Sequence, residues 1–401
     1  MERRAFLVGA GSLALAQLTS SCSNGNRAAL KVRLLRDSIP AQLVGEFRRG
    51  LQQSATVKFD PAKQIDELFK NLKAWKQQAE KKDAQSQLPL PFIGSKTPAI
   101  ADLVTLGDYW LETAIAQQLI QPLKLDDLTG WQQLPPRWQE IVRRNNQGQV
   151  TKSGSIWGAP YRWGTTVIAY NREKFKELGW TPKDWSDLWR PELRDRISLL
   201  DQPREVIGLA LKKLGASYNT TNLQQVPNLK KELLALHQQV KFYSSSHYLQ
   251  PLVLGDTYVA VGWSTDILPL RTTYREIEAV VPVSGTALWA DMWVQPASVT
   301  TESNLEETGN RQALMNQWID YCWQSKPARE ISLFTNATSP ILTGITPTDL
   351  PKDLRENPLR LPAPSVLAKS EFLRPLPKSA LAQYESLWKE IRLSKADLAS
   401  S

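Results

Sequence analysis

Histidine is scarce in this chain of 401 residues, which has only His237 and His247. Neither lies near a cysteine or at the spacing of metal ligands, so a histidine-centred active site or zinc site is poorly supplied. We interpret both as ordinary polar residues. The sequence also lacks a Gly-x-Ser-x-Gly turn, a phosphate-binding loop and a dinucleotide-binding motif. These absences argue against an enzyme, and we expect no catalytic residue, no metal and no cofactor.

Cysteine is equally rare, with Cys22 and Cys322 alone. If Cys22 is removed or modified during maturation, Cys322 has no partner within the chain, so we expect no disulfide. A free cysteine beside Trp318, Tyr321 and Trp323 is most simply a buried apolar residue.

A basic block is missing as well. The formal net charge is +9, but lysine and arginine are interspersed with aspartate and glutamate. This pattern favours a solvated surface over a nucleic-acid interface. Hydrophobic residues make up 42% and charged residues 22%, which is typical of a soluble globular protein. A chain of this length is too long for one compact core and suits two lobes.

The N-terminus has the layout of an export signal. Arg3 and Arg4 precede a weakly apolar run, Ala5–Leu18, which is shorter than the roughly 20 residues of a membrane-spanning helix. Arg3 to Leu7 also resembles the twin-arginine export motif. Small residues then lead to Cys22 in a stretch that resembles a lipobox, although Leu18 lies one position too early. We expect export and a lipid anchor on Cys22; the alternative is an ordinary cleaved signal followed by an incidental cysteine.

The mature chain alternates strand-like and helix-like patterns, which predicts α/β lobes with mainly parallel sheets. Short apolar runs predict strands at Leu30–Leu35, Ile100–Leu106, Thr165–Tyr170, Ile197–Leu200, Tyr258–Val261 and Ala279–Val281. Apolar residues at helical spacing predict helices around Ile39–Phe47, Ile65–Trp75, Ile207–Leu214, Leu314–Cys322 and Leu381–Ile391. We expect a polar loop at Lys81–Gln87 and an extended surface connection through the proline-rich Pro340–Pro377.

Several segments in the middle of the chain carry a resemblance to a known family. They are Ile156–Thr166, Trp185–Trp189 with Pro191–Leu193, Leu200–Val206, Leu214-Gly215 with Asn219–Thr221, and Gly262–Ser264 with Trp289–Pro296. Their order and spacing resemble the spermidine/putrescine-binding proteins, the extracellular solute-binding components of ABC importers. The resemblance is specific over Trp157–Pro296 and fainter from Leu30 to Trp388.

The resemblance implies a two-lobed α/β fold of the periplasmic binding protein type (type II), with the ligand in the cleft between the lobes. Residues 1–29 would be the export signal and tether. The first lobe would comprise residues 30–164 and 291–345, and the second residues 165–290 and 346–395. In the family, the strand that carries Gly164–Thr166 crosses between the lobes, and the strand with Trp289–Asp291 returns.

The resemblance also implies the ligand site. Trp263 and Trp289 would be aromatic walls, Glu205 and Asp291 would be acids that bind ammonium groups, and Tyr109 matches a cleft tyrosine. Trp289 and Asp291 lie two residues apart on a predicted strand and therefore on one face. Two alternatives stay open. Glu205 could merely favour a helix N-terminus electrostatically, and Trp263 could be an ordinary core residue.

This chain departs from the family pattern at several positions. Gln202 stands where the family has an acid, and Leu35 and Ser38 stand where the first strand offers a tryptophan and a tyrosine. A late tyrosine and a late glutamine of the family fall near Asn336 and Leu373. The second-lobe half of the site is therefore kept, with one acid lost, while the first-lobe half is largely rewritten.

We therefore expect an exported, monomeric solute-binding protein, located in the periplasm or at the outer side of the inner membrane. It would bind a polyamine or related small amine and deliver it to an ABC-transporter permease, without binding nucleic acid. An alternative is an exported enzyme or ligand sensor on the same scaffold with a rewritten cleft.

Overall fold

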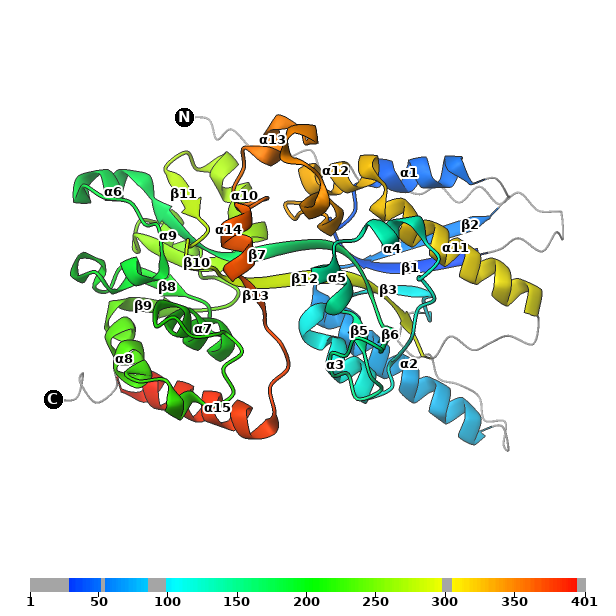
Figure 1. Cartoon of the computed structure of the whole chain (residues 1–401), viewed down its shortest axis with the longest axis horizontal. Coiled ribbons are helices and arrows are strands. Elements are labelled where there is room, and N and C mark those ends of the chain that lie inside the picture. Colours follow the sequence, from blue (N-terminus) through cyan, green and yellow to red (C-terminus); the bar gives the residue numbers. More distant parts are fainter. Residues whose placement is uncertain (1–28, 52–54, 86–98, 298–304, 395–401) are drawn as a thin grey trace, which may run out of the picture.

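Two lobes joined by long strands make up the protein (Figure 1). The structure is a computed structural model that describes residues 29–51, 55–85, 99–297 and 305–394. The expected export signal, its Cys22 and the tether lie outside the described residues. Strands β7 (Ala159–Asn171) and β12 (Ala287–Pro296) run from one lobe to the other.

In the described part of the chain, eleven strands form one sheet with the central order β2-β1-β3-β12-β7-β10-β8-β9. Its ends are parallel, because β1 pairs in parallel with β2 and β3, and β8 with β9 and β10. Strands β7 and β12 are antiparallel to each other in the middle. The remaining bounds are β1 Ala29–Leu35, β2 Thr56–Ala62, β3 Leu103–Gly107, β4 Ile120–Gln121, β8 Ile197–Leu199, β9 Val240–Tyr243, β10 Val259–Trp263, β11 Ile277–Val280 and β13 Glu371–Phe372. A separate pair joins β5 (Arg143–Arg144) to β6 (Ser155–Ile156).

Helices cover both parts of this sheet (Figure 1). The first lobe has α1 Ala41–Gly50, α2 Ile65–Gln85, α3 Asp108–Ala116, α4 Thr129–Gln133, α5 Pro136–Glu140, α11 Leu305–Trp323, α12 Ser325–Phe334 and α13 Lys352–Arg355. The second lobe has α6 Arg172–Leu178, α7 Pro203–Lys213, α8 Leu229–Gln239, α9 Gln250–Val253, α10 Ser264–Thr273 and α15 Lys378–Leu393. Helix α14 (Pro364–Lys369) precedes β13 between the lobes. Within the described ranges, no helix has the length and apolar character that crossing a membrane requires.

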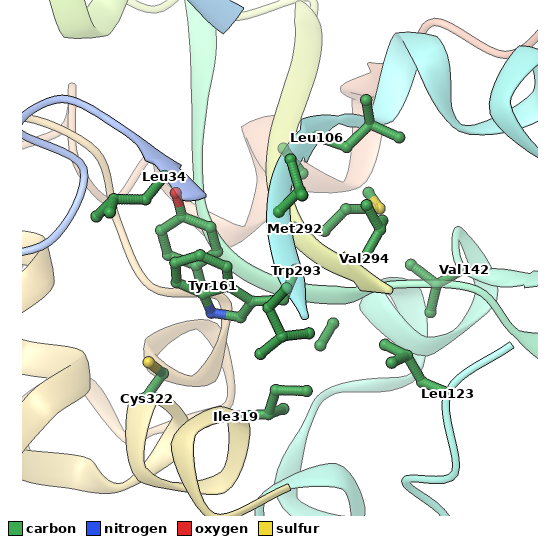
Figure 2. Packing of buried hydrophobic residues seen from close by; sticks show 14 of the residues in the cluster. Leu34, Leu106, Leu123, Val142, Tyr161, Met292, Trp293, Val294, Ile319 and Cys322 are labelled. Atoms are coloured by element: carbon green, nitrogen blue, oxygen red, sulfur yellow. The ribbon is translucent and has the colours of Figure 1, made fainter. Parts of the chain in front are cut away.

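Each lobe has its own hydrophobic core. In the first lobe, the ring of Tyr161 stacks on that of Trp293 with 4.3 Å between ring centroids. Figure 2 shows these rings within the cluster that contains Leu34, Ile319 and the buried free Cys322. Such close packing of aromatic rings buries large apolar areas, and many of the tryptophans of this chain are buried in the cores in this way.

The second lobe packs helices on both faces of its sheet. Ile168 on β7 belongs to the cluster that contains α7, α8 and α15 residues, whereas Val167 and Ala169 belong to the cluster with Ile267 of α10. Successive residues of a strand point to opposite faces, so β7 is buried on both. The uninterrupted apolar run Val167–Tyr170 of this strand follows from that position. The α/β fold prediction is confirmed, but the sheet is mixed and not mainly parallel, because the crossing strands β7 and β12 pair antiparallel with each other and with most of their neighbours.

Two local predictions were wrong. The loop expected at Lys81–Gln87 is helical as far as Gln85, because α2 extends beyond its apolar stripe. Lysine, glutamine and alanine are good helix formers, so a polar composition does not end a helix. The proline-rich stretch is not an extended surface connection. It forms several short helices, and Leu342 and Leu354 in it are fully buried. The physical reason is that proline is well suited to the first helical position, which Pro340 and Pro364 occupy.

The boundaries of the two lobes stay a prediction. Leu288 and Ala290 of the crossing strand β12 pack into the first core, as do Leu350, Leu354 and Phe372. The chain thus keeps contact with the first lobe beyond residue 345 before it reaches α15.

Candidate functional site

One face of the crossing strand β7 organises the candidate site. Arg162, Gly164 and Thr166 alternate along this strand and therefore point to the same side. Their register partners are Asp291 and Trp289 on β12 and Trp263 on β10, in that order. The strands thus place three of the predicted ligand residues, Asp291, Trp289 and Trp263, side by side between the lobes. We call these three residues the row on β7.

Asp291 is engaged by a positive charge of the protein itself. Nε and Nη2 of Arg162 lie 2.8 Å and 2.7 Å from Oδ2 of Asp291, and both side chains are buried. Burial raises the pKa of Asp291, and the guanidinium of Arg162 opposes this rise. Arginine stays protonated in proteins, so the two form a buried ion pair. Asp291 therefore does not offer an uncompensated negative charge to a ligand.

The indole of Trp289 lies against the strand at Gly164. A Cβ atom on Gly164 would be 2.3 Å from Cζ2 of Trp289 and 2.6 Å from Oγ of Ser264, which is closer than atoms can approach. Glycine is therefore required here for the indole to reach this position. Trp289 is half-buried, which is compatible with an aromatic wall of a binding site.

Glu205 is the buried carboxylate on the second-lobe side. It lies in the first turn of α7 and accepts a hydrogen bond of 3.0 Å from Oγ1 of Thr166. The side chain of Trp263 also interacts with it, so the two residues lie together. Burial raises the pKa of Glu205 to about 7, and the hydrogen bonds from Thr166 and Trp263 oppose the shift. A bound ammonium group would favour the charged form of this carboxylate.

Tyr109 and Gln202 lie further out. Tyr109, in the first turn of α3, is 60% exposed and contacts the ring of Trp110 edge-on. It lies close enough to Arg204 for an electrostatic interaction across the cleft. Gln202 is the exposed residue that precedes α7, and its side chain makes no capping hydrogen bond. Among the described residues, no hydrogen bond joins Gln202 to the row on β7.

Sequence reasoning missed two charged residues of this region. Arg162 is the only charged residue of β7, and a lone charge in a buried strand is a signal of a buried partner. Asp108 follows the buried strand β3 and is itself buried, with Oδ1 accepting a hydrogen bond of 3.0 Å from the backbone of Ala290. Burial raises the pKa of Asp108 to about 7. Its position at the end of a strand and the start of a helix could have marked it.

Much of the chain matches a known protein family. Residues 99–363 match the family described as bacterial extracellular solute-binding protein. Spermidine/putrescine-binding periplasmic protein 1 of Haemophilus influenzae is 24% identical over 294 residues, which cover 73% of this chain and 75% of the relative. The spermidine/putrescine-binding periplasmic protein of Salmonella typhimurium is 28% identical over 197 residues, which cover 49% of this chain and 54% of that relative.

The fold also has solved counterparts. The spermidine/putrescine ABC transporter substrate-binding protein PotD from Streptococcus pneumoniae superimposes with a TM-score of 0.73 at 19% identity. This match covers 91% of the chain and 98% of the solved structure, and it shows the shared two-lobed fold. Together with the family match over residues 99–363, this establishes that the chain belongs to the bacterial extracellular solute-binding proteins.

Proposed function

We propose that the protein is the solute-binding component of an ABC importer, which captures a small amine between its lobes and delivers it to a permease. The observation that carries this proposal is that Glu205, Trp263 and Trp289 lie together on one face of the crossing strand β7. Aromatic faces and carboxylates are the groups that recognise ammonium ions. The relatives named for spermidine and putrescine support an amine as the ligand. Closure of the two lobes would trap the solute without catalysis.

The charge of the site limits which amines are expected to bind. Asp291 is neutralised by Arg162, and Gln202 carries no charge, so Glu205 is the remaining acid among the residues expected to face the ligand. A solute with one ammonium group in the cleft suits this balance better than a triamine. Tyr109 at the rim would contact the solute from the first lobe.

We expect small amines to raise the melting temperature of the purified mature protein. A ligand that binds only the folded state stabilises it by RT ln(1 + [L]/Kd), about 2.7 kcal/mol at a hundredfold excess over Kd. Differential scanning calorimetry with cadaverine, putrescine, spermidine and linear monoamines measures this shift. The uncharged 1,5-pentanediol serves as control for solvent effects. If no amine shifts the transition more than the diol does, the protein does not bind this class of solute.

Trp289→Ala is expected to weaken whichever solute binds by about 1–3 kcal/mol, because the substitution removes contact area and leaves the charges in place. The loss should be similar for charged and uncharged solutes of equal length. Titration calorimetry of wild type and variant measures it. Trp388→Ala is the matched control, since Trp388 is a half-buried tryptophan on α15, outside the row on β7. Equal losses in the two variants would mean that Trp289 acts only through stability.

We further propose that the protein is exported by a twin-arginine signal and anchored through a lipid on Cys22, as a monomer on the outer side of the inner membrane. Its N-terminal layout and the periplasmic relatives support this location. Arg3→Lys together with Arg4→Lys should block export. Cys22→Ala should instead move the exported protein from the membrane fraction to the soluble fraction, as followed by fractionation and immunoblotting. Recovery of the unaltered protein in the soluble fraction would contradict the anchor and leave export untouched.

A further inference from the structure

A cavity of about 440 Å³ is lined by residues of both lobes, and the residues of the row on β7 are not among them. Its first-lobe wall includes Asp108 of α3 and Arg144 of β5, and its second-lobe wall includes Ser217 and Asn219, which follow α7. The segment from Ser370 to Arg374, which contains β13, also lines it. Asp108 links the cavity to the site because its side chain holds the backbone of Ala290, next to Asp291.

Arg144 is an unusual buried charge. The residue is 4% exposed, and its side chain donates from Nε to the carbonyl oxygen of Ile141 at 2.8 Å and from Nη1 to that of Gly148 at 3.0 Å. Among the described residues, Nη2 has no hydrogen-bond partner, and no carboxylate forms an ion pair with the guanidinium within 4 Å. Burying a charge is costly unless it is paired, so Arg144 is prepared for an anionic group from outside the chain.

Two further arginines line the same cavity. Arg137 is half-buried, and its Nη1 and Nη2 donate to the carbonyl oxygens of Leu367 and Ser370 at 2.8 Å and 2.6 Å. Arg374 is exposed at the rim and lies within electrostatic range of Arg144. A guanidinium has five N–H donors in a planar fork that matches a carboxylate, and main-chain carbonyls leave its charge in place.

The acids of the cavity do not cancel these charges by direct contact. Glu371 is already bound by Lys212 at 2.9 Å, by Oγ of Ser217 at 2.7 Å and by the backbone of Tyr218 at 2.9 Å. Glu140 is exposed. Asp108 and Glu112 lie within electrostatic range of Arg144 but form no ion pair with it in the described part of the structure. The cavity therefore presents both signs of charge, with arginine as the buried cation.

We infer that this cavity binds the carboxylate end of the solute, so that the ligand is a linear amino acid whose amine lies toward Glu205 and whose carboxylate meets Arg144. The inference rests on the proposed function, because it places the amine in the same cleft. A diamine fits this arrangement poorly, since its second ammonium group would approach three guanidinium groups. Like charges that are brought together in a partly buried site repel each other and exclude the wrong solute.

Three solutes with five-carbon chains test this inference by titration calorimetry of the mature protein. Cadaverine has two ammonium groups, 5-aminopentanoate has one ammonium and one carboxylate, and glutarate has two carboxylates. We expect 5-aminopentanoate to bind at least tenfold more tightly than cadaverine and glutarate. Tighter binding of cadaverine would overturn the inference and leave the proposed function intact. Failure of all three and of every amine in the thermal panel would overturn both.

Substitutions locate the carboxylate contact. Arg144→Met is expected to weaken 5-aminopentanoate at least tenfold and to abolish its preference over cadaverine. Arg143→Met is the matched control, because Arg143 is the neighbouring residue of β5, pairs with Asp126 at 2.8 Å and does not line the cavity. Substitution of the buried Arg144 could disturb folding, so Arg374→Gln at an exposed position provides a second variant. We expect it to weaken the affinity for 5-aminopentanoate about threefold. Binding of 5-aminopentanoate at wild-type strength to both cavity variants would overturn the inference.

Discussion

Replacing Arg162 by methionine is expected to destabilise the protein by about 3–5 kcal/mol. The substitution leaves the carboxylate of Asp291 buried without its partner, and breaking a buried ion pair from one side costs this much. The loss should appear as a lower midpoint of urea denaturation, followed by tryptophan fluorescence. An ammonium ligand that reaches Asp291 should restore part of the stability of this variant.

The double variant Arg162→Met with Asp291→Leu separates pairing from packing. Replacing both charges by apolar side chains of similar size is often neutral or stabilising, so the double variant should be far more stable than Arg162→Met. The exposed pair Lys70–Asp66 provides the surface comparison, and Asp66→Ala should cost about 0–1 kcal/mol. A double variant that is as unstable as the single one would show that Arg162 acts through packing and not through the charge of Asp291.

The free energy of unfolding should decrease as pH rises from about 4.5 to 7, because Glu205 titrates in this window. Its pKa rises from the ordinary value of 4.5 to about 7 in the folded protein, as burial disfavours the carboxylate. In this window the folded state therefore holds a proton that the unfolded state has released. Stability then decreases by about 1.4 kcal/mol per pH unit, or about 3 kcal/mol over the window. Glu205→Gln removes the titrating group, so the variant should lose less stability than wild type as pH rises from 5 to 8.

Asp108 also has a pKa raised to about 7 and contributes to the pH dependence of both wild type and Glu205→Gln. The difference between their pH profiles of stability, measured by urea denaturation, therefore isolates the contribution of Glu205. The exposed Glu192→Gln is the control, because it removes a carboxylate outside the candidate site. Parallel profiles for wild type and Glu205→Gln would mean that Glu205 is charged in the folded protein throughout this range. In that case it would offer a free carboxylate to a ligand even below pH 6.

The candidate site was predictable in part. The resemblance named Glu205, Trp263 and Trp289, and the structure brings all three to β7. It also named Asp291, and the structure places it in the same row, but its partner could not be read from the sequence. Arg162 and Asp291 are 129 residues apart, and only the antiparallel pairing of β7 and β12 puts them opposite each other. Gln202 stays at the exposed start of α7, and among the described residues no hydrogen bond joins it to the row.

The local fold was largely determined by the sequence. Alternation and continuous apolar runs identify the strands, since burial of a strand on one or both faces is recorded in its own residues. The same holds for the amphipathic helices α7 and α15, whose apolar stripes pack together in the second lobe. The predictions for the end of α2 and for the proline-rich segment were based on composition and not on periodicity, and both were wrong.

Only the tertiary structure decided the electrostatics of the cleft. The sequence by itself determined α/β patterning and a length that suits two lobes, and its resemblance to a known family implied the crossing strands and a set of tryptophans and acids suited to an amine. It did not reveal that Asp291 is neutralised by Arg162 or that Arg144 is buried with main-chain carbonyls as its acceptors. The physical reason is that hydrophobic periodicity is a local property of the chain. The charge of a buried group depends instead on which distant residue the folded strands and loops place beside it.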